Sequence, residues 1–267
     1  MNKTIGWVFL LLCVPAFAQA PKKAAKPAKA VRKTASTAAP KTAAVKTLTP
    51  AEMLRRADDA RAPEGTFSFQ VKITDYDGSQ ALRTNVYKVY SKDDKYARIE
   101  TLAPARLQGR TILLRGEDLW LYLPSVKKPT RISLQQRLTG EVANGDIART
   151  RFFDDYAAKI SGKEMIGGRP HHILDLRAKN DTVTYRRVQL WVDAANYQPA
   201  KAQFYALSGK LLKTSTYADF TPALGLPRAS KVIIKDALAP NKQSHLTYQD
   251  YARENLDDSF FAKEALP

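Results

Sequence analysis

Cysteine is almost absent from this 267-residue chain, which has only Cys13. It lies inside an apolar N-terminal run and follows Leu12, whereas a lipid-attachment signal places a small residue before its cysteine. We therefore expect neither a lipid anchor nor a disulfide in the mature chain. Without disulfides, the fold must be held by a hydrophobic core of sufficient size.

The chain also lacks an apolar run long enough to span a bilayer. Its N-terminal run, residues 5–14, has about half of the roughly 20 residues that a transmembrane helix needs. Lys3 precedes this run and the small-residue sequence AFA at residues 16–18 follows it, which is the layout of a secretory signal peptide. We expect a signal peptide over residues 1–18, cleavage near Ala18 and an exported protein.

Acidic and aromatic residues are missing from residues 21–47, which consist mainly of Ala, Lys, Thr and Pro. Such a segment cannot bury enough apolar surface to offset the entropy lost on ordering, so we expect residues 19–48 to be a disordered basic linker. It carries eight of the basic residues of a chain whose net charge is +17. An exported chain rarely meets nucleic acid, so we do not expect that partner. An anionic membrane surface and a mere solvated tether remain the alternatives.

Residues that carry chemistry are scarce. Only three histidines occur, of which His171 and His172 are adjacent and point to opposite faces of a strand, while His245 stands alone. Nucleophile elbows and phosphate-binding glycine loops are absent from the sequence. Asp154–Asp155 and Asp257–Asp258 are neighbouring pairs typical of solvated or capping carboxylates. We expect no catalytic residue, no metal and no cofactor.

The folded domain, residues 49–267, is predicted to begin with a helix and to continue almost wholly as strands. Thr49, Pro50 and Glu52 form a capping box with proline at the first helical position. Phe67, Phe69, Val71 and Ile73 then alternate with polar residues, as in a half-buried antiparallel strand. Further strands are predicted at residues 85–90, 96–101, 111–114, 119–123, 172–176, 183–192, 202–205, 211–217, 230–235 and 245–251. About eleven strands joined by short turns should form an antiparallel meander that curls.

One predicted strand, residues 119–123, is apolar on both faces. Leu119 and Leu121 project to one side and Trp120 and Tyr122 to the other, so both faces must be covered by a core, a second layer or an apolar ligand. Residues 134–155 break the strand pattern and would suit either a lid over the open side of the sheet or a long surface connection.

Three segments resemble the outer-membrane lipoprotein-sorting family of LolA-like periplasmic proteins: LWLYLPSVKKPTRIS, RVQLWVDAANYQPAKAQFYALSGKLLKTSTYADF and LDDSFF. The resemblance runs from about Thr49 to the C-terminus and excludes the basic linker. It implies a mainly β fold with a few helices, in which a curled antiparallel sheet, an unclosed β-barrel, is covered by helices on its concave side. It also implies a periplasmic location and an apolar cavity for acyl chains.

Two functions therefore follow as hypotheses. The first is a periplasmic carrier or chaperone that binds a lipid or acylated protein and transfers it toward the outer membrane, between an inner-membrane donor complex and an outer-membrane acceptor. The second is a sensor similar to RseB-type regulators, in which lipid occupancy controls a protein contact. Neither is an enzyme.

For a head group, we expect contacts from Lys127, Lys128 and Arg131. For acyl chains, we expect a groove beside the helix that begins at Pro50, lined by Phe67, Phe69, Val71, Leu119, Leu121 and Trp191, or by Trp120 and Tyr122 if the other face of their strand looks inward.

Overall fold

A computed structural model describes residues 48–266. The predicted signal peptide lies outside the described residues, and so does the predicted linker apart from its last residue. In chain order the elements are α1 (Pro50–Asp59), β1 (Thr66–Asp77), β2 (Gln80–Lys92), β3 (Tyr96–Ala103), a 3-10 helix (Ala105–Leu107), β4 (Thr111–Arg115), β5 (Asp118–Tyr122), β6 (Thr130–Ile132), β7 (Arg137–Thr139), β8 (Val142–Ala143), α2 (Asn144–Ala148), β9 (Tyr156–Ile166), β10 (Arg169–Ala178), β11 (Arg187–Asp193), β12 (Pro199–Tyr205), β13 (Leu211–Ala223), β14 (Leu226–Asp236), β15 (Lys242–Arg253) and two 3-10 helices (Asp258–Phe261 and Lys263–Ala265).

Helix α1 begins as its sequence predicts. The side chain of Thr49 accepts a hydrogen bond from the backbone N–H of Glu52, and the Glu52 carboxylate accepts one from the backbone N–H of Thr49 at 2.7 Å. These two bonds satisfy amide groups that have no partner inside the first turn. The apolar stripe of α1 is buried in a core cluster with residues of β10 to β12. The helix thus covers one end of the sheet.

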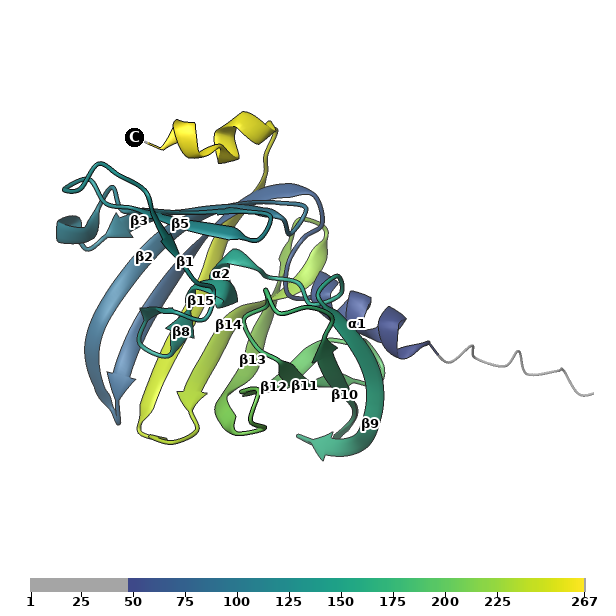
Figure 1. Cartoon of the computed structure of the whole chain (residues 1–267). Coiled ribbons are helices and arrows are strands. Elements are labelled where there is room, and N and C mark those ends of the chain that lie inside the picture. The colour runs from purple at the N-terminus through teal and green to yellow at the C-terminus, as the bar shows by residue number, and fades with distance from the viewer. Residues whose placement is uncertain (1–47, 267) are drawn as a thin grey trace, which may run out of the picture. The chain divides into compact units, whose positions relative to one another are not determined.

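Thirteen strands form one antiparallel sheet in the order β6-β5-β4-β3-β2-β1-β15-β14-β13-β12-β11-β10-β9. Consecutive strands pair from β1 to β6 and again from β9 to β15, and the pairing of β15 with β1 joins the two meanders. Within the described residues the end strands β6 and β9 each pair on one side only, so the sheet is not closed into a barrel. Figure 1 shows that the sheet curls. This confirms the predicted mainly β fold with a curled, unclosed antiparallel sheet.

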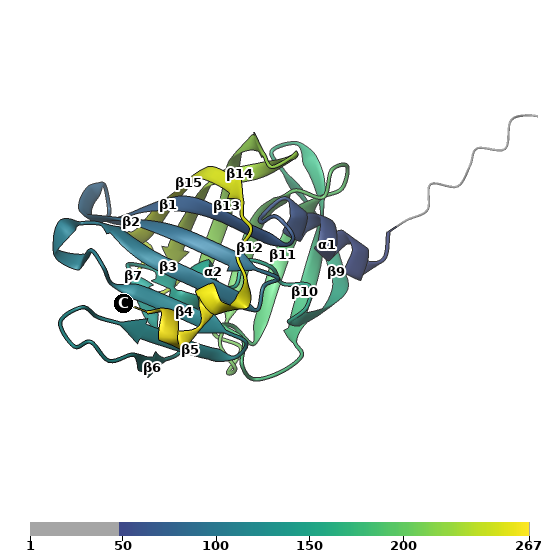
Figure 2. The ribbon, with the colours of Figure 1, turned by 90° about the horizontal axis from the view of Figure 1, so that it is seen from above.

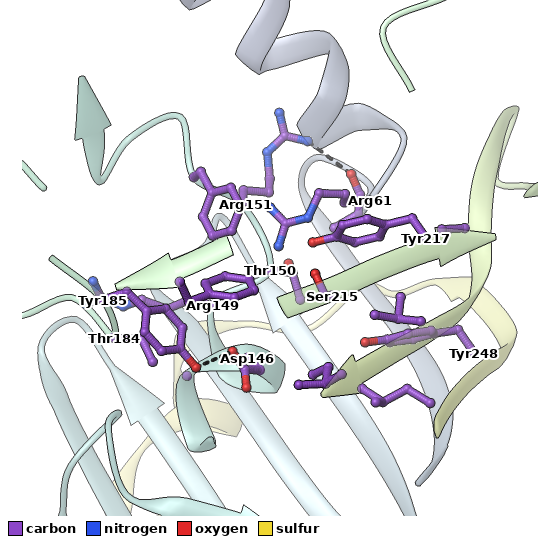
Figure 3. Close-up of a pocket in the computed structure, with 18 of the residues that line it drawn as sticks. Arg61, Asp146, Arg149, Thr150, Arg151, Thr184, Tyr185, Ser215, Tyr217 and Tyr248 are labelled. Atoms are coloured by element: carbon purple, nitrogen blue, oxygen red, sulfur yellow. Dashed lines mark hydrogen bonds between the residues drawn. The ribbon is translucent and has the colours of Figure 1, made fainter. Parts of the chain in front are cut away.

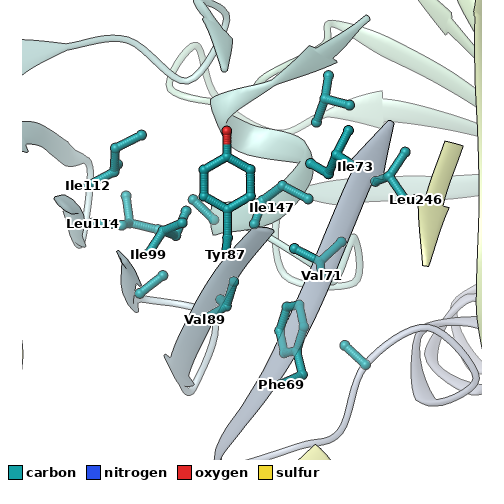
Figure 4. Packing of buried hydrophobic residues seen from close by; sticks show 14 of the residues in the cluster. Phe69, Val71, Ile73, Tyr87, Val89, Ile99, Ile112, Leu114, Ile147 and Leu246 are labelled. Atoms are coloured by element: carbon teal, nitrogen blue, oxygen red, sulfur yellow. The ribbon is translucent and has the colours of Figure 1, made fainter. Parts of the chain in front are cut away.

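Residues 134–155, which we call the cover segment, contain β7, β8 and α2 and lie over the concave side of the sheet. Ile147 of α2 packs among the side chains that β1 to β4 project inward, including Ile73, Tyr87 and Ile99 (Figure 4). Each large apolar side chain buried in this way contributes roughly 1.5–3 kcal/mol. Of the two interpretations of this segment, the structure supports a cover over the sheet.

Strand β5 is buried on both faces, as its two-sided pattern requires. Leu119 is buried in the concave core, and Leu121 packs against the same cluster. On the other face the ammonium of Lys263 lies 4.4 Å from the centre of the Trp120 ring. The two C-terminal 3-10 helices cross the convex side of β3, β4 and β5 (Figure 2), and Phe261, the last residue of the first of them, is fully buried. The second cover is therefore the C-terminus of the chain itself.

Some strand bounds differ from the prediction. Residues 183–186 are not part of a strand, although Val183 and Tyr185 are buried in the core. Their turn is held locally, because Arg186 donates to the backbone carbonyl of Asn180 at 2.9 Å. Strand β9 is absent from the predicted set, because this edge strand is largely solvent-exposed and lacks the alternating pattern on which the prediction relies.

Candidate functional site

A cavity lies on the concave side of the sheet, beneath the cover segment (Figure 3). Its volume is about 60 Å³. Its floor is apolar because Val232 and Ile234 of β14 and Leu246 of β15 project inward at alternate positions. Phe67 and Phe69 of β1 continue this floor, and Gly145 and Phe152 of the cover segment contribute to the opposite wall.

Three polar anchors hold the cover segment over the cavity, and the first is Asp146 of α2. Its carboxylate accepts hydrogen bonds from the Tyr185 hydroxyl at 2.9 Å and from the Ala143 backbone N–H at 2.8 Å, and it pairs with the Lys213 ammonium. Burial and the nearby Asp146 raise the pKa of Tyr185 well above its ordinary value, so the hydroxyl keeps its proton as a donor. This anchor joins α2 to β13.

The second anchor fastens the β7–β8 hairpin to the far end of the floor. The buried carboxylate of Asp75 accepts from the hydroxyls of Thr139 and Ser244, both at 2.6 Å, and Ser244 accepts from the Glu141 backbone N–H at 2.9 Å. Gly140 at the tip has φ +46°, and a Cβ there would lie 1.9 Å from Asp75 Oδ1. Only glycine fits this close approach.

The third anchor joins the end of the cover segment to α1. Asp58 is fully buried, and its carboxylate accepts from the backbone N–H groups of Phe152 and Phe153, each at 2.8 Å. Arg61 donates to the other oxygen of Asp58 at 3.0 Å, and the guanidinium of Arg61 lies 3.7 Å from the centre of the Phe152 ring. Burial raises the pKa of Asp58, and Arg61 and Arg151 oppose that rise.

Arg151 extends this anchor into a cluster of carboxylates. Its guanidinium contacts Asp59 at 2.9 Å, Glu64 at 3.2 Å and Asp94 at 3.3 Å. Burial, followed by the charge of Asp58, raises the pKa of Asp94 to about 7. The cover segment is thus joined to the sheet and to α1 through buried charged groups. Removing one partner of a buried ion pair leaves the other charge uncompensated, which is strongly destabilising.

The predicted groove residues fall into two groups. Phe67 and Phe69 line the cavity, and Val71, Leu119 and Leu121 belong to the apolar core beside it. The cavity borders residues just after α1, Arg61 and Ala62, and α1 itself does not line it.

The remaining aromatic residues of the predicted groove lie elsewhere. Trp120 and Tyr122 alternate with Leu119 and Leu121, so they face the convex side. Leu190 and Val192 point into the core, so Trp191 between them also faces outward, where its Nε1 donates to Glu164 at 2.6 Å. The structure therefore does not bring these three aromatic residues to the cavity.

The predicted head-group residues lie on the β5–β6 connection and on β6. Lys127 and Lys128 are exposed, and Arg131 pairs with Asp118 on the neighbouring strand. Within residues 48–266 they are not among the residues that line the cavity. A head-group contact from these residues stays a prediction.

Sequence reasoning missed most of the polar cavity wall, in particular Ser215, Tyr217 and Tyr248. Their strands were predicted, but alternation alone does not say which face of a strand looks inward, and polar residues at alternate positions indicate a solvent face. Among the described residues, no group of three or more His, Cys, Asp or Glu side chains could hold a metal ion. In residues 48–266 no helix combines the length and the apolar character needed to cross a membrane.

Comparison with known proteins places this architecture among solved structures. A family model described as an uncharacterized protein matches residues 93–267. A LolA superfamily protein from Nitrosomonas europaea is 40% identical to the chain, with a TM-score of 0.78 over 82% of this chain and 100% of that one. A comparison with curated proteins gave no match.

Two more distant structures share the fold. A putative outer-membrane lipoprotein-sorting protein domain from Vibrio parahaemolyticus is 22% identical, with a TM-score of 0.69 over 81% of this chain and 97% of that one. A DUF1329 family protein from Desulfovibrio piger is also 22% identical, with a TM-score of 0.70 over 82% of this chain and 98% of that one. At this identity the likeness concerns the fold alone.

Proposed function

The chain belongs to the LolA superfamily, and from this we propose that it is a non-enzymatic periplasmic carrier that binds acyl chains in the cavity beneath the cover segment and transfers them toward the outer membrane. The observation that carries this proposal is the cavity with an apolar floor, enclosed by a segment that polar anchors hold in place. Each methylene group moved from water into such a site contributes roughly 0.8 kcal/mol. Acyl chains therefore supply ample affinity without any chemical step.

Binding requires the cover segment to move. The cavity of about 60 Å³ has room for roughly four to six water molecules, at about 10–15 Å³ of such volume for each, which is too little for a chain of about sixteen carbons. The cover segment meets the sheet through polar anchors, whose donors and acceptors can be hydrated when it lifts, and through apolar side chains such as Ile147. Lifting it would therefore expose apolar side chains and the cavity floor unless a ligand covers them. An acyl chain is suited to cover that floor.

A reversible lock tests this function. Gly145 of α2 faces Thr184, and a Cβ on Gly145 would lie 2.9 Å from the Thr184 Cβ. The two segments must therefore move apart by about 0.6 Å to reach the 3.5–4.5 Å of a disulfide. In the mature chain, which begins after the expected signal peptide and so lacks Cys13, the double variant Gly145→Cys, Thr184→Cys should lock the cover segment when oxidised. The assay measures transfer of a dye-labelled phospholipid from donor to acceptor vesicles.

We expect transfer by the reduced protein, loss of transfer on oxidation and recovery on reduction, with the cysteine-free mature parent unaffected by either treatment. Transfer that continues at the same rate in the fully oxidised protein would refute a carrier cavity under this segment. Lipid binding by the reduced protein without any transfer would favour the alternative of a lipid-responsive sensor.

A further inference from the structure

One wall of the cavity carries hydroxyl groups that the protein itself does not use. Ser215 of β13 is 2% exposed, and its Oγ has no hydrogen-bond partner among the described residues. Tyr217 of the same strand and Tyr248 of β15 line the cavity beside it, and Figure 3 draws no hydrogen bond from either hydroxyl to the other residues shown. A buried hydroxyl without a partner, such as that of Ser215, costs free energy, so this wall calls for a ligand that supplies the missing atom.

These groups are suited to donate to a ligand. Burial raises the pKa of Tyr248, so its hydroxyl remains protonated, and serine hydroxyls stay protonated in water. The ligand should therefore offer acceptor oxygens on the polar side of the cavity and hydrocarbon on the floor formed by Val232, Ile234 and Leu246.

The charges around the cavity decide which acceptor fits. Arg61 pairs with Asp58 at 3.0 Å, and Arg149 pairs with Asp155 at 3.1 Å. Two other cations nearby are equally engaged, Lys213 with Asp146 and Arg151 with three carboxylates. Arg228, near Tyr251, donates to the backbone carbonyls of Ala223 and Asp59. No cationic side chain among the four with carboxylate partners is left to balance an anion, so a neutral acceptor is favoured over a carboxylate or phosphate at this point.

We propose that the cavity recognises the carbonyl oxygens of glycerol-linked acyl esters through the hydroxyls of Ser215, Tyr217 and Tyr248, a specificity that rests on the carrier function proposed above. An ester carbonyl is neutral, accepts two hydrogen bonds and joins the hydrocarbon chain directly to the polar backbone of a lipid. With the carbonyls at the hydroxyl wall, the chains extend over the apolar floor and the head group remains outside the cavity. Phospholipids and diacylglyceryl-modified proteins both contain this group.

Matched ester and ether ligands test the proposal, because an ether analogue keeps the chains and the head group and lacks only the carbonyl oxygens. The first pair is dioctanoyl phosphatidylcholine and its dioctyl ether, and the second pair is a diacylglyceryl-cysteine peptide and its dialkyl ether. Isothermal titration of the full chain measures each dissociation constant. We expect the ester to bind about fivefold more tightly for each hydrogen bond formed, in at least one pair. The pair that shows the preference identifies whether the ester belongs to a phospholipid or to a modified protein.

Single substitutions connect the preference to the proposed residues. Ser215→Ala and Tyr248→Phe should each reduce the ester preference by about fivefold and leave ether binding unchanged, because each removes one hydroxyl and little volume. Thr216→Val is the matched control, since Thr216 follows Ser215 on β13 and is exposed on the other face; it should keep the full preference.

The outcomes separate this proposal from the function on which it rests. Equal binding of ester and ether in both pairs, or a preference that survives both substitutions, would overturn the ester specificity while the carrier function stands. If no ester and no ether binds, the carrier function fails and the ester specificity fails with it.

Discussion

Asp58 Oδ2 accepts a hydrogen bond from the backbone N–H of Phe152 at 2.8 Å. Because Asp58 ends the buried face of α1 and Phe152 lies in the cover segment, this single carboxylate joins the first helix to the segment that encloses the cavity. The same carboxylate bonds Phe153 and Arg61, so its loss leaves several buried donors without an acceptor.

We expect Asp58→Ala to lower the free energy of unfolding by on the order of 3 kcal/mol, since it leaves two amide groups and the Arg61 guanidinium without their buried partner. Urea unfolding measures the loss. Glu64→Gln is the control, because Glu64 also pairs with this cluster, through Arg151, but its side chain is 62% exposed; its effect should be below about 1 kcal/mol. Equal losses in the two variants would contradict the anchoring role of Asp58.

The raised pKa of Asp94 predicts a pH dependence of stability. Burial and the charge of Asp58 raise this pKa to about 7, so the folded state holds the Asp94 proton more tightly than the unfolded chain does. The stability that this group contributes is fully present below about pH 4 and is lost as the pH rises through about 7. We expect the wild-type free energy of unfolding, relative to that of Asp94→Asn, to fall between pH 4 and pH 8. A difference that is constant over this range would contradict the raised pKa.

Gly140 provides a test of the hairpin anchor. A methyl group at this position would collide with Asp75 Oδ1 at 1.9 Å, in addition to the strain of φ +46°. We expect Gly140→Ala to lower the free energy of unfolding by about 3 kcal/mol, the sum of the strain and the overpacking.

Gly167→Ala separates strain from collision, because Gly167 has φ +57° and a methyl group there would meet no atom within 4 Å. Its loss should be about 1 kcal/mol, from strain alone. Equal losses of stability in the two glycine variants would contradict a contribution of the close approach between the hairpin and Asp75 to the free energy of unfolding.

We predict that the basic linker binds anionic membrane surfaces electrostatically and that the folded domain is equally stable without it. Deleting residues 21–47 should leave the thermal midpoint unchanged, and it should weaken binding to anionic vesicles at low salt, since each lysine near such a surface contributes up to about 1 kcal/mol. The difference should shrink as salt screens the charges. Equal binding to vesicles at low salt with and without these residues would leave the linker as a tether only.

Local signals in the sequence are enough to predict much of this fold. The capping box at Thr49 and the alternation from Phe67 to Ile73 each depend on neighbours in the chain, and the structure confirms both. The two-sided pattern around Leu119 and Trp120 correctly requires a cover on each face. That the second cover is the C-terminal segment depends on contacts more than a hundred residues apart, which no local pattern encodes.

The cavity wall is harder to predict for the same reason. Alternation divides a strand into two faces but does not say which of them looks inward, so the predicted groove includes Trp191 although this residue faces outward. Ser215 and Tyr217 show the converse problem, since polar residues on a strand indicate a solvent face although the cover segment encloses these two. Their position follows from the curl of the sheet and from anchors such as Asp146 to Lys213, which form only in the folded state.

Binding of acyl chains on the apolar floor of this cavity can be checked without any assumed cargo, by mass spectrometry of the lipid that co-purifies with the protein. Ile234→Glu places a carboxylate on the floor, where an unpaired charge is costly, whereas Ile233→Glu places one on the opposite face of β14. Circular dichroism establishes that both variants are folded before their lipid is compared. We predict stoichiometric acyl lipid on the wild-type protein and on Ile233→Glu, and little or none on folded Ile234→Glu. Equal lipid on the two folded variants, or none on the wild-type protein, would contradict acyl-chain binding on this floor.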